Sequence, residues 1–229
     1  MEFSGIQKTS AIDFPGRLCS ILFTHGCMFR CHYCHNPDLV FGNDVKQIAE
    51  DDILDELNQR KNLVSAVSIT GGEATLHKGL PDFIKRLKDD DFAVKIDTNG
   101  TNPDVVKELL PMLDFIAMDV KAVDQEHYKQ TVGVPVDFDK IKESIKLIMG
   151  SGKEYEFRTT VVPKLFPLER FEELGQLLKG SKKHVLQQFV NKKTLNPEYT
   201  KEAPYTKEEL EQAKMILEKY VDAVEIRGI

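Results

Sequence analysis

Short apolar runs alternate with amphipathic segments along most of this chain, and this alternation constrains its fold more than any other feature. Seven runs have the apolar, often β-branched composition of strands and cover residues 18–24, 66–70, 92–97, 115–120, 156–162, 185–190 and 223–226. Between them, apolar residues recur at helical spacing within residues 80–87, 106–113, 141–148, 171–178 and 210–220. Strands that alternate with helices form a mostly parallel sheet with helical crossovers. The sequence therefore predicts an α/β fold, a partial (β/α)6-type TIM barrel with mostly parallel strands.

The length and composition are those of one ordinary globular domain. The chain has 229 residues, of which 41% are hydrophobic and 30% charged, so it can bury a sizeable core without disulfide bonds. No fixed-period repeat and no linker-like boundary is visible, and we expect a single domain over residues 1–229. In barrels of this kind the chemistry lies at the carboxyl ends of the strands, so functional motifs are expected directly after the predicted strands.

The charge balance argues against several classes of partner. Lys and Arg number 31 against 37 for Asp and Glu, a formal net charge of −6, whereas general nucleic-acid binders show a basic surplus. No apolar stretch approaches transmembrane length, and residues 1–10 lack the apolar run of a signal peptide. We therefore expect a cytoplasmic protein with no nucleic-acid and no membrane partner.

Three of the four cysteines fall in one short loop directly after the first predicted strand. Cys27, Cys31 and Cys34 have the spacing C-x3-C-x2-C, which can direct three thiolates at one small object. A [4Fe–4S] cluster usually takes four thiolates, so three would leave one iron open to a chelating ligand. The fourth cysteine, Cys19, lies within the strand and is expected to be a buried core thiol.

Zinc is the other interpretation of this loop. Cys3His zinc sites exist, and His25, His32 and His35 lie close by. Structural zinc sites, however, usually draw two ligands from each of two separated segments, whereas these three thiols share one loop. The spacing favours iron–sulfur over zinc.

The cysteine loop and four later motifs carry a resemblance to a known family. With Tyr33 as the aromatic residue, C-x3-C-x-aromatic-C is the signature of the radical SAM superfamily, whose members cleave S-adenosylmethionine (SAM). The wider segment 13–37 resembles the glycyl-radical-enzyme activating proteins. It is most similar to the short anaerobic ribonucleoside-triphosphate reductase activating proteins, with pyruvate formate-lyase activating enzyme as a close relation. The later motifs follow in the order expected of the family and are Gly71-Gly72-Glu73, Asp97-Thr98-Asn99-Gly100, Asp119-Val120-Lys121 and Arg158.

The resemblance implies two cofactors and a set of residues that hold them. Cys27, Cys31 and Cys34 would bind the [4Fe–4S] cluster, and no catalytic side chain beyond the cluster and SAM is required. The residues implied in SAM binding are Tyr33 and His35 for the adenine, Gly71, Gly72 and Glu73 for the amino group, Asp119 and Lys121 nearby, and Arg158 for the carboxylate. It also implies a monovalent cation enclosed by Asp97, Thr98 and Asp119.

Two of these residues have a structural interpretation as well. Arg158 could form an ion pair with Glu73 or Asp119 instead of binding a ligand, because a strand arginine rarely stays unpaired in a core. Asp97 could cap a turn, as aspartate often does.

The partner implied by the resemblance is a glycyl-radical enzyme. Anaerobic ribonucleoside-triphosphate reductase is the first choice, because Gln187-Gln188-Phe189 resembles that branch and Val190 stands where the pyruvate formate-lyase activators have a histidine. An electron donor such as flavodoxin or ferredoxin is implied too. The alternatives are activation of another glycyl-radical enzyme such as pyruvate formate-lyase, a radical SAM reaction on a small molecule, and a zinc-binding interaction module without catalysis.

Overall fold

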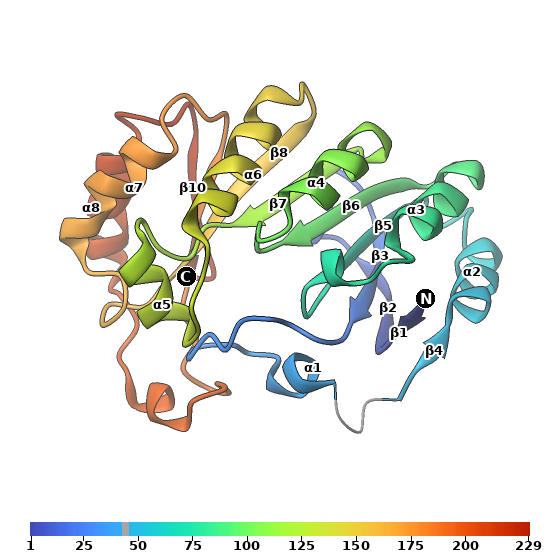
Figure 1. The fold of residues 1–229 in the computed structure, drawn as a ribbon, viewed down its shortest axis with the longest axis horizontal. Coiled ribbons are helices and arrows are strands. Elements are labelled where there is room, and N and C mark those ends of the chain that lie inside the picture. The colour runs from blue at the N-terminus through green and yellow to red at the C-terminus, as the bar shows by residue number, and fades with distance from the viewer. Residues whose placement is uncertain (43–45) are drawn as a thin grey trace.

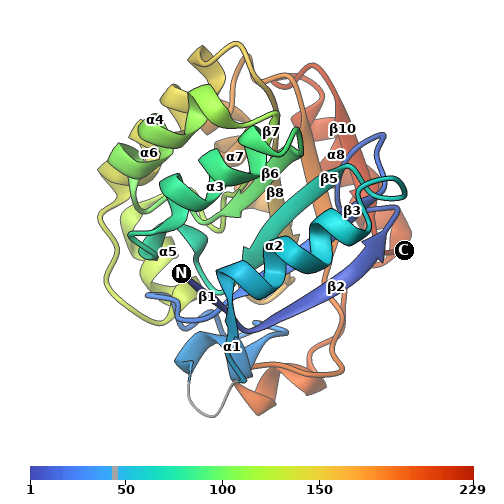
Figure 2. The ribbon, with the colours of Figure 1, turned by 90° about the vertical axis from the view of Figure 1, so that its right-hand side faces the viewer.

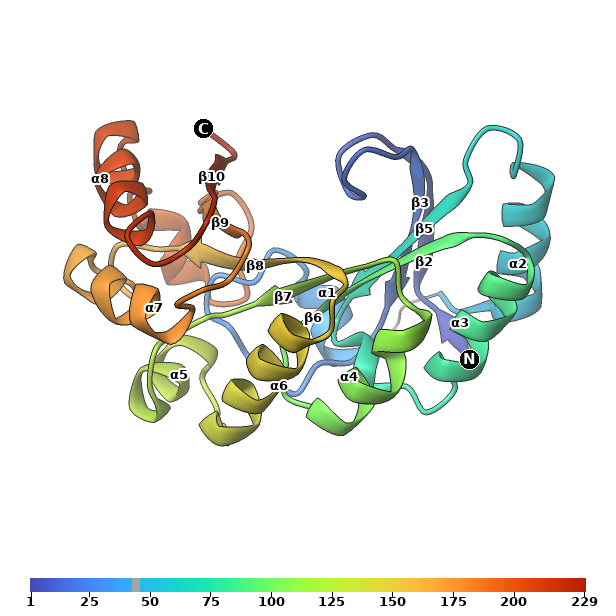
Figure 3. The same ribbon diagram turned by 90° about the horizontal axis from the view of Figure 1, so that it is seen from above.

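The computed structural model describes residues 1–42 and 46–229, and its main element is a curved, open sheet (Figure 1). In the described residues this sheet has eight strands in the order β10-β9-β8-β7-β6-β5-β3-β2. Every neighbouring pair is parallel except β2 with β3, which is antiparallel. Seen from above, the helices lie along the convex side of the sheet, while the β2–β3 loop and β10 flank its open side (Figure 3). The predicted partial barrel is therefore confirmed.

All seven predicted strands are present, and no end is shifted by more than two residues. They are β3 (Cys19–Thr24), β5 (Ala66–Gly71), β6 (Ala93–Thr98), β7 (Phe115–Asp119), β8 (Glu154–Val161), β9 (His184–Gln188) and β10 (Val224–Arg227). The five predicted helices are present as α3 (Leu80–Asp89), α4 (Pro103–Leu109), α6 (Phe138–Gly150), α7 (Phe171–Leu177) and α8 (Lys207–Leu217). As Pro111 predicts, α4 stops at Leu109 and a 3₁₀ turn, Leu110–Met112, follows it.

Several elements were not predicted from the sequence. They are β1 (Glu2–Phe3), β2 (Gly5–Ser10), β4 (Ile48–Ala49), α1 (Pro37–Phe41), α2 (Glu50–Gln59) and α5 (Gln125–Val132). Strand β2 is an edge strand whose middle three residues are exposed, so it lacks the apolar alternation that marks a half-buried strand. It runs along the sheet margin beside α2 (Figure 2), and β1 pairs with β4 in a separate two-stranded ribbon.

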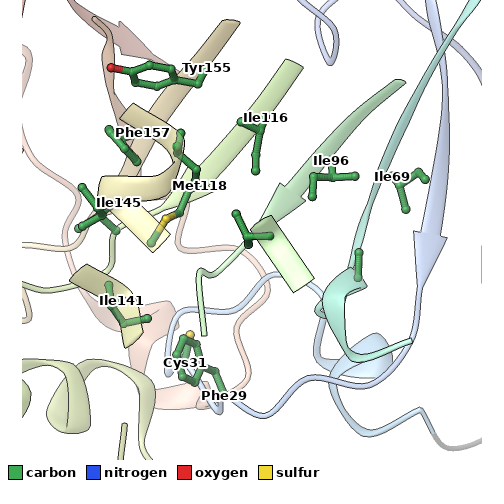
Figure 4. Close-up of a cluster of buried hydrophobic side chains, with 14 of the residues drawn as sticks. Phe29, Cys31, Ile69, Ile96, Ile116, Met118, Ile141, Ile145, Tyr155 and Phe157 are labelled. Carbon is green, nitrogen blue, oxygen red and sulfur yellow. The ribbon is translucent and has the colours of Figure 1, made fainter. Parts of the chain in front are cut away.

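The convex face of the sheet carries the larger hydrophobic core. Side chains such as Ile69, Ile96, Ile116 and Met118 point from the strands toward the helices, and Phe29 and Cys31 lie at one end of the same cluster (Figure 4). Full burial of an Ile or Phe side chain contributes about 1.5–3 kcal/mol each. This packing fixes the positions of the strands and hence of everything that follows their carboxyl ends.

The concave face changes from apolar to charged along the strands. At the amino ends, Cys19, Ala66, Ala93 and Phe115 form a small second cluster with Phe14, Ile21 and Ala117. Toward the carboxyl ends, the inward positions of β6, β7 and β8 become Lys95, Asp97, Asp119, Glu156 and Arg158. Because strand side chains alternate between faces, charged and apolar residues can alternate along one strand.

Among the described residues, no helix is both long and apolar enough to cross a membrane.

Candidate functional site

The cysteine loop leaves β3 through a glycine turn and is held against α1. Gly26 has a φ of +78°, in the left-handed region that favours glycine. Its N–H donates to the Leu39 carbonyl at 2.7 Å, and the N–H of Cys27 donates to the Val40 carbonyl at 3.2 Å. A Cβ on Gly26 would meet no atom within 4 Å, so it is the backbone angle, and not a lack of space, that favours this glycine.

The three thiols of the loop line one cavity. Cys31 is 7% exposed, and burial raises the pKa of its thiol to about 12. Burial also raises the pKa of Cys27, which the Phe29 N–H partly offsets by donating to the sulfur at 3.4 Å. Asn99 Nδ2 lies 3.9 Å from the same sulfur. Binding of a metal group would therefore release protons from these thiols.

The described residues contain no group of three or more His, Cys, Asp or Glu side chains gathered closely enough to hold a metal ion. Cys27, Cys31 and Cys34 thus share a cavity wall without converging on one point. Three thiols on one loop are nevertheless the donors that an iron–sulfur cluster uses, and hydrogen-bond donors beside the Cys27 sulfur are typical of the surroundings of such ligands. The residues present fit a cluster of this kind.

The cavity, of about 200 Å³, brings together every residue that the sequence assigned to a cofactor or cation. The loop after β3, the turn after β5, and β6, β7 and β8 all contribute to it, so it lies at the carboxyl ends of the parallel strands, as expected. The assigned residues in its lining are Cys27, Cys31, Tyr33, Cys34, His35, Gly71, Gly72, Glu73, Asp97, Thr98, Asp119, Lys121 and Arg158. Asn36, Val40, Thr70, Asn99 and Thr160 complete the lining and had not been assigned.

Gly71, the last residue of β5, and Gly72 are required by the backbone at the end of β3 and at the start of the cysteine loop. A Cβ on Gly71, whose φ is +120°, would lie 2.4 Å from the Thr24 carbonyl oxygen, and one on Gly72 would lie 2.0 Å from that of Gly26. The same Gly26 oxygen accepts a hydrogen bond from the Glu73 N–H at 2.8 Å. The Gly-Gly pair therefore lets the two loops that line the cavity pack directly against each other.

The Glu73 carboxylate is buried and fully engaged within the chain. One oxygen accepts from the Thr75 hydroxyl at 2.6 Å, the Thr75 N–H at 3.2 Å and the Thr98 hydroxyl at 2.7 Å, and the other accepts from the Asn99 N–H at 2.7 Å. Burial raises its pKa, and these hydrogen bonds oppose that effect. Glu73 thus joins the turn after β5 to the end of β6, and the suggested ion pair between Arg158 and Glu73 is absent.

A cluster of five charged side chains lies at one wall of the cavity, and four of them line it. Arg158 donates from Nε to Asp119 at 2.9 Å and lies 3.2 Å from Asp97 through Nη2. Lys121 pairs with the second oxygen of Asp119 at 3.0 Å, and Lys95 pairs with the second oxygen of Asp97. Of the two structural partners considered for Arg158, Asp119 is the one that it pairs with, and Asp97 forms ion pairs instead of capping a turn.

These pairings keep the cluster ionised. Burial alone would raise the pKa of Asp97, but the charges of Arg158 and Lys95 hold it below the ordinary value. The pKa of Asp119 is likewise lowered, because Lys121 and Arg158 outweigh its burial. In return, the two carboxylates raise the pKa of Arg158 above its usual range despite burial, and Asp119 does the same for Lys121. At neutral pH these four groups all carry charge.

A second and larger cavity, of about 410 Å³, lies on the other side of this charged wall. It shares Asp119 and Arg158 with the first and is also lined by Lys95, Glu156 and Arg227. Glu156, only 1% exposed, accepts from both terminal nitrogens of Arg227 at 2.8 Å. Sequence reasoning missed these last three residues. The signal was present in the alternation Lys-Ile-Asp at 95–97, Glu-Phe-Arg at 156–158 and Glu-Ile-Arg at 225–227, which places charges on one face of a strand.

Tyr33 and His35 both line the cavity, but their surroundings differ. Tyr33 is 5% exposed, and its hydroxyl is buried without a hydrogen-bond partner. The His35 ring stacks on Phe189 with centroids 6.0 Å apart, and its Nδ1 lies 2.8 Å from the Lys193 carbonyl oxygen. The segment after β9 therefore orients His35 at the cavity edge.

Comparison with known proteins gives consistent matches. The family described as "Radical SAM superfamily" matches residues 21–180. The "putative glycyl-radical enzyme activating enzyme" of Methanocaldococcus jannaschii is 36% identical over 99% of this chain and 95% of its own length. The pyruvate formate-lyase-activating enzyme of Clostridium pasteurianum is 29% identical over 76% of this chain and 75% of its own length.

Solved structures share the fold at low sequence identity. A domain of pyruvate-formate lyase-activating enzyme from Bacteroides vulgatus has a TM-score of 0.59 at 19% identity, covering 71% of this chain and 98% of that domain. Streptococcus suis SuiB bound to S-adenosylmethionine has a TM-score of 0.69 at 17% identity, covering 91% of this chain and 52% of SuiB.

Proposed function

The chain belongs to the radical SAM superfamily, among the glycyl-radical enzyme activating enzymes, and on this premise we propose that it cleaves SAM at a [4Fe–4S] cluster held by Cys27, Cys31 and Cys34. The observation that carries the proposal is the single cavity in which these thiols meet the turn after β5 and the charged ends of β6, β7 and β8. A zinc-binding interaction module would need the thiols alone, and the rest of this arrangement would have no use.

The cofactors supply the difficult chemistry. Cys27, Cys31 and Cys34 would hold the cluster, which when bound and reduced would supply the electron for cleavage of SAM into methionine and the 5′-deoxyadenosyl radical that would take a hydrogen atom from a glycine of the partner. The chain's own residues hold and orient SAM. Lys121 and Arg158 are the cations that face the cavity, and Arg158 has the planar fork that suits a carboxylate.

The remaining residues keep the cavity in shape and charge. Glu73 ties the Gly71-Gly72 turn to the end of β6 by accepting from the Asn99 N–H, which fixes the backbone that would receive the SAM amino group. Asp119 holds both Lys121 and Arg158 by ion pairs, so the two cations stay in place before the ligand enters. Tyr33 and His35 are assigned to the adenine.

The partner we propose is anaerobic ribonucleoside-triphosphate reductase, with the whole of residues 1–229 acting as one domain. Gln187-Gln188-Phe189 and the absent histidine at Val190 support this choice. Pyruvate formate-lyase is the second candidate, and the similarity to the Clostridium pasteurianum enzyme supports it. Flavodoxin or ferredoxin is the proposed electron donor.

The first test is SAM cleavage by anaerobically reconstituted protein. The wild type should contain iron, show a brown colour that fades in air, and form 5′-deoxyadenosine after reduction. Cys31→Ala should lose the product, whereas Cys19→Ala should keep it, because Cys19 lies in the separate cluster at the amino ends of the strands. A colourless protein that holds zinc, or undiminished product from Cys31→Ala, would contradict the proposal.

The second test identifies the partner. Reconstituted protein, SAM and reductant are incubated with either reductase or pyruvate formate-lyase, and the glycyl radical is measured by electron paramagnetic resonance. A radical on the reductase alone supports the first choice, and a radical on the lyase alone replaces it with the second. Turnover of a small molecule with no radical on either protein would refute activation of a glycyl-radical enzyme.

A further inference from the structure

The acidic residues expected to enclose a monovalent cation are already matched by cationic side chains. Both oxygens of Asp97 are paired, one with Lys95 and the other with Arg158 at 3.2 Å. Both oxygens of Asp119 are paired too, with Arg158 at 2.9 Å and with Lys121 at 3.0 Å. Each of the four carboxylate oxygens thus faces an ammonium or guanidinium group.

The three cations approach these acids from different sides. Lys121 and Arg158 line the smaller cavity, where the cysteines lie, so a carboxylate bound there would meet both of them. Lys95 lines only the larger cavity, behind the charged wall. Its side chain is 3% exposed and also lies 3.3 Å from the Ser68 hydroxyl. A ligand in the smaller cavity can therefore draw Arg158 away from Asp97 without displacing Lys95.

The net charge of the five side chains also argues against an additional monovalent cation. Three cations and two carboxylates give this cluster a net charge of +1, and the carboxylate of one bound ligand brings it to zero. An additional alkali cation would restore an uncompensated charge in a buried site, which is costly. Without Lys95 the cluster would be neutral, and a ligand carboxylate would then leave it one positive charge short.

We propose that the Lys95 ammonium takes the place of a free monovalent cation in this site. Lys95 is then a positioning residue, which keeps the Asp97 carboxylate oriented toward Arg158. The assignment rests on the proposed SAM site for its role in the reaction. The pairing itself, however, belongs to the protein alone, so it can be tested without cluster or SAM.

Two consequences distinguish this role from a merely structural one. Wild-type protein should be indifferent to the identity of the monovalent cation. Lys95→Ala removes the charge and leaves space for a small cation, so it should acquire a dependence on potassium or methylammonium. Lys95→Met removes the charge but fills the space, so it should lose stability and SAM affinity as Lys95→Ala does, and neither potassium nor methylammonium should restore them.

The first arm measures thermal unfolding of the cluster-free chains at constant ionic strength. Tetramethylammonium chloride, whose cation is too large for the vacated space, is replaced by potassium or methylammonium chloride. The midpoint of Lys95→Ala should rise by about 3 °C or more, whereas those of the wild type, Lys95→Met and Lys8→Ala should not change. Lys8 is the matched control, because it is an exposed lysine that pairs with Glu56 on the surface.

The second arm measures SAM cleavage by the reconstituted proteins in the same salts. In tetramethylammonium chloride, Lys95→Ala should show a rise of about tenfold in the KM for SAM, largely reversed by potassium or methylammonium. Lys95→Arg, which keeps the charge, should remain within about threefold of the wild type.

The outcomes separate this proposal from the proposed function. Stimulation of wild-type cleavage by potassium, or a folded Lys95→Ala that no small cation stabilises or rescues, would overturn the role of Lys95. If Lys95→Ala does not fold, the wild-type comparison between potassium and tetramethylammonium still decides the matter, with equal rates supporting the role. Absence of 5′-deoxyadenosine from every protein would instead refute the proposed function and leave the unfolding arm intact.

Discussion

Substitution of Gly72 by alanine should damage both the stability and the site of this protein. An added Cβ would lie 2.0 Å from the Gly26 carbonyl oxygen and 2.8 Å from its carbon. Contacts between carbon and carbonyl oxygen begin at about 3.3 Å, so the two backbone segments would have to separate by roughly 1.3 Å. The obstacle is backbone on both sides, and no side-chain rotation can relieve it.

The cost follows from what this separation breaks. Forced overpacking costs about 1–3 kcal/mol. The hydrogen bond from the Glu73 N–H to the same Gly26 oxygen, 2.8 Å long, would be lost, and a buried donor without a partner costs about 1–3 kcal/mol. We expect Gly72→Ala to lower the free energy of unfolding by about 3–4 kcal/mol. Because the displaced turn lines the cavity, a shift of about 1 Å should also reduce the rate of SAM cleavage by about 100-fold.

Urea denaturation of the cluster-free proteins measures the first effect, with Gly26→Ala as the comparison. Gly26 has a φ of +78° but open space around a Cβ, so alanine there should cost only the left-handed backbone energy, about 1–2 kcal/mol. A Gly72→Ala protein as stable as Gly26→Ala would show that the two loops are not in the close contact described, and the reasoning would fail.

Three further perturbations test other parts of the structure. Burial lowers the pKa of His184 to about 3 from an ordinary 6.5, so below pH 6.5 the unfolded chain binds a proton that the folded chain does not. The free energy of unfolding should therefore fall by about 1.4 kcal/mol for each pH unit below pH 6.5, and His184→Leu should remove that part of the slope in urea titrations between pH 6.5 and 4.5. Arg227→Met should lower the free energy of unfolding by about 3–5 kcal/mol, because it leaves the buried Glu156 without its bidentate partner; a loss below about 1 kcal/mol would show that Glu156 is adequately solvated. Glu73→Gln keeps the shape but turns an amide donor toward the Asn99 N–H, so calorimetry should show a stability loss of about 1–3 kcal/mol, and an unchanged unfolding midpoint would contradict the described pairing.

The helices and strands that the sequence predicted are those whose apolar residues, spaced as in a helix or a strand, are the ones buried in the structure. β3, β5, β6 and β7 are short apolar runs because helices cover their convex face, and α3 shows its buried residues at helical spacing. β2 was missed because its stability comes from pairing with β3 rather than from its own polar residues. The same reason applies to the ribbon of β1 and β4, which are two residues each.

For the candidate site, the sequence predicted which residues take part but not how they pair. The residues from the cysteine loop to Arg158 could be named in advance from their motifs and the family resemblance that these carry, and all of them line one cavity. Their pairings could not be named. Lys95 and Arg227 carry no motif. Lys95 lies two residues from Asp97 on the same strand, whereas Arg227 reaches Glu156 from a strand 71 residues away in the sequence.

By itself, the sequence determined the chemistry available to this protein: three thiols in one loop, a Gly-Gly-Glu turn, and charged residues at the ends of strands in a fixed order. Tertiary structure alone decided which of these groups meet. Curvature of the sheet brings β6, β7 and β8 close enough for Arg158 to reach both Asp97 and Asp119, and the alternation of strand side chains places Lys95 on the same face of β6 as Asp97, where the two pair. The reason is physical: a motif is local in the chain, whereas the compensation of buried charge depends on distances between strands, which only the packed core fixes.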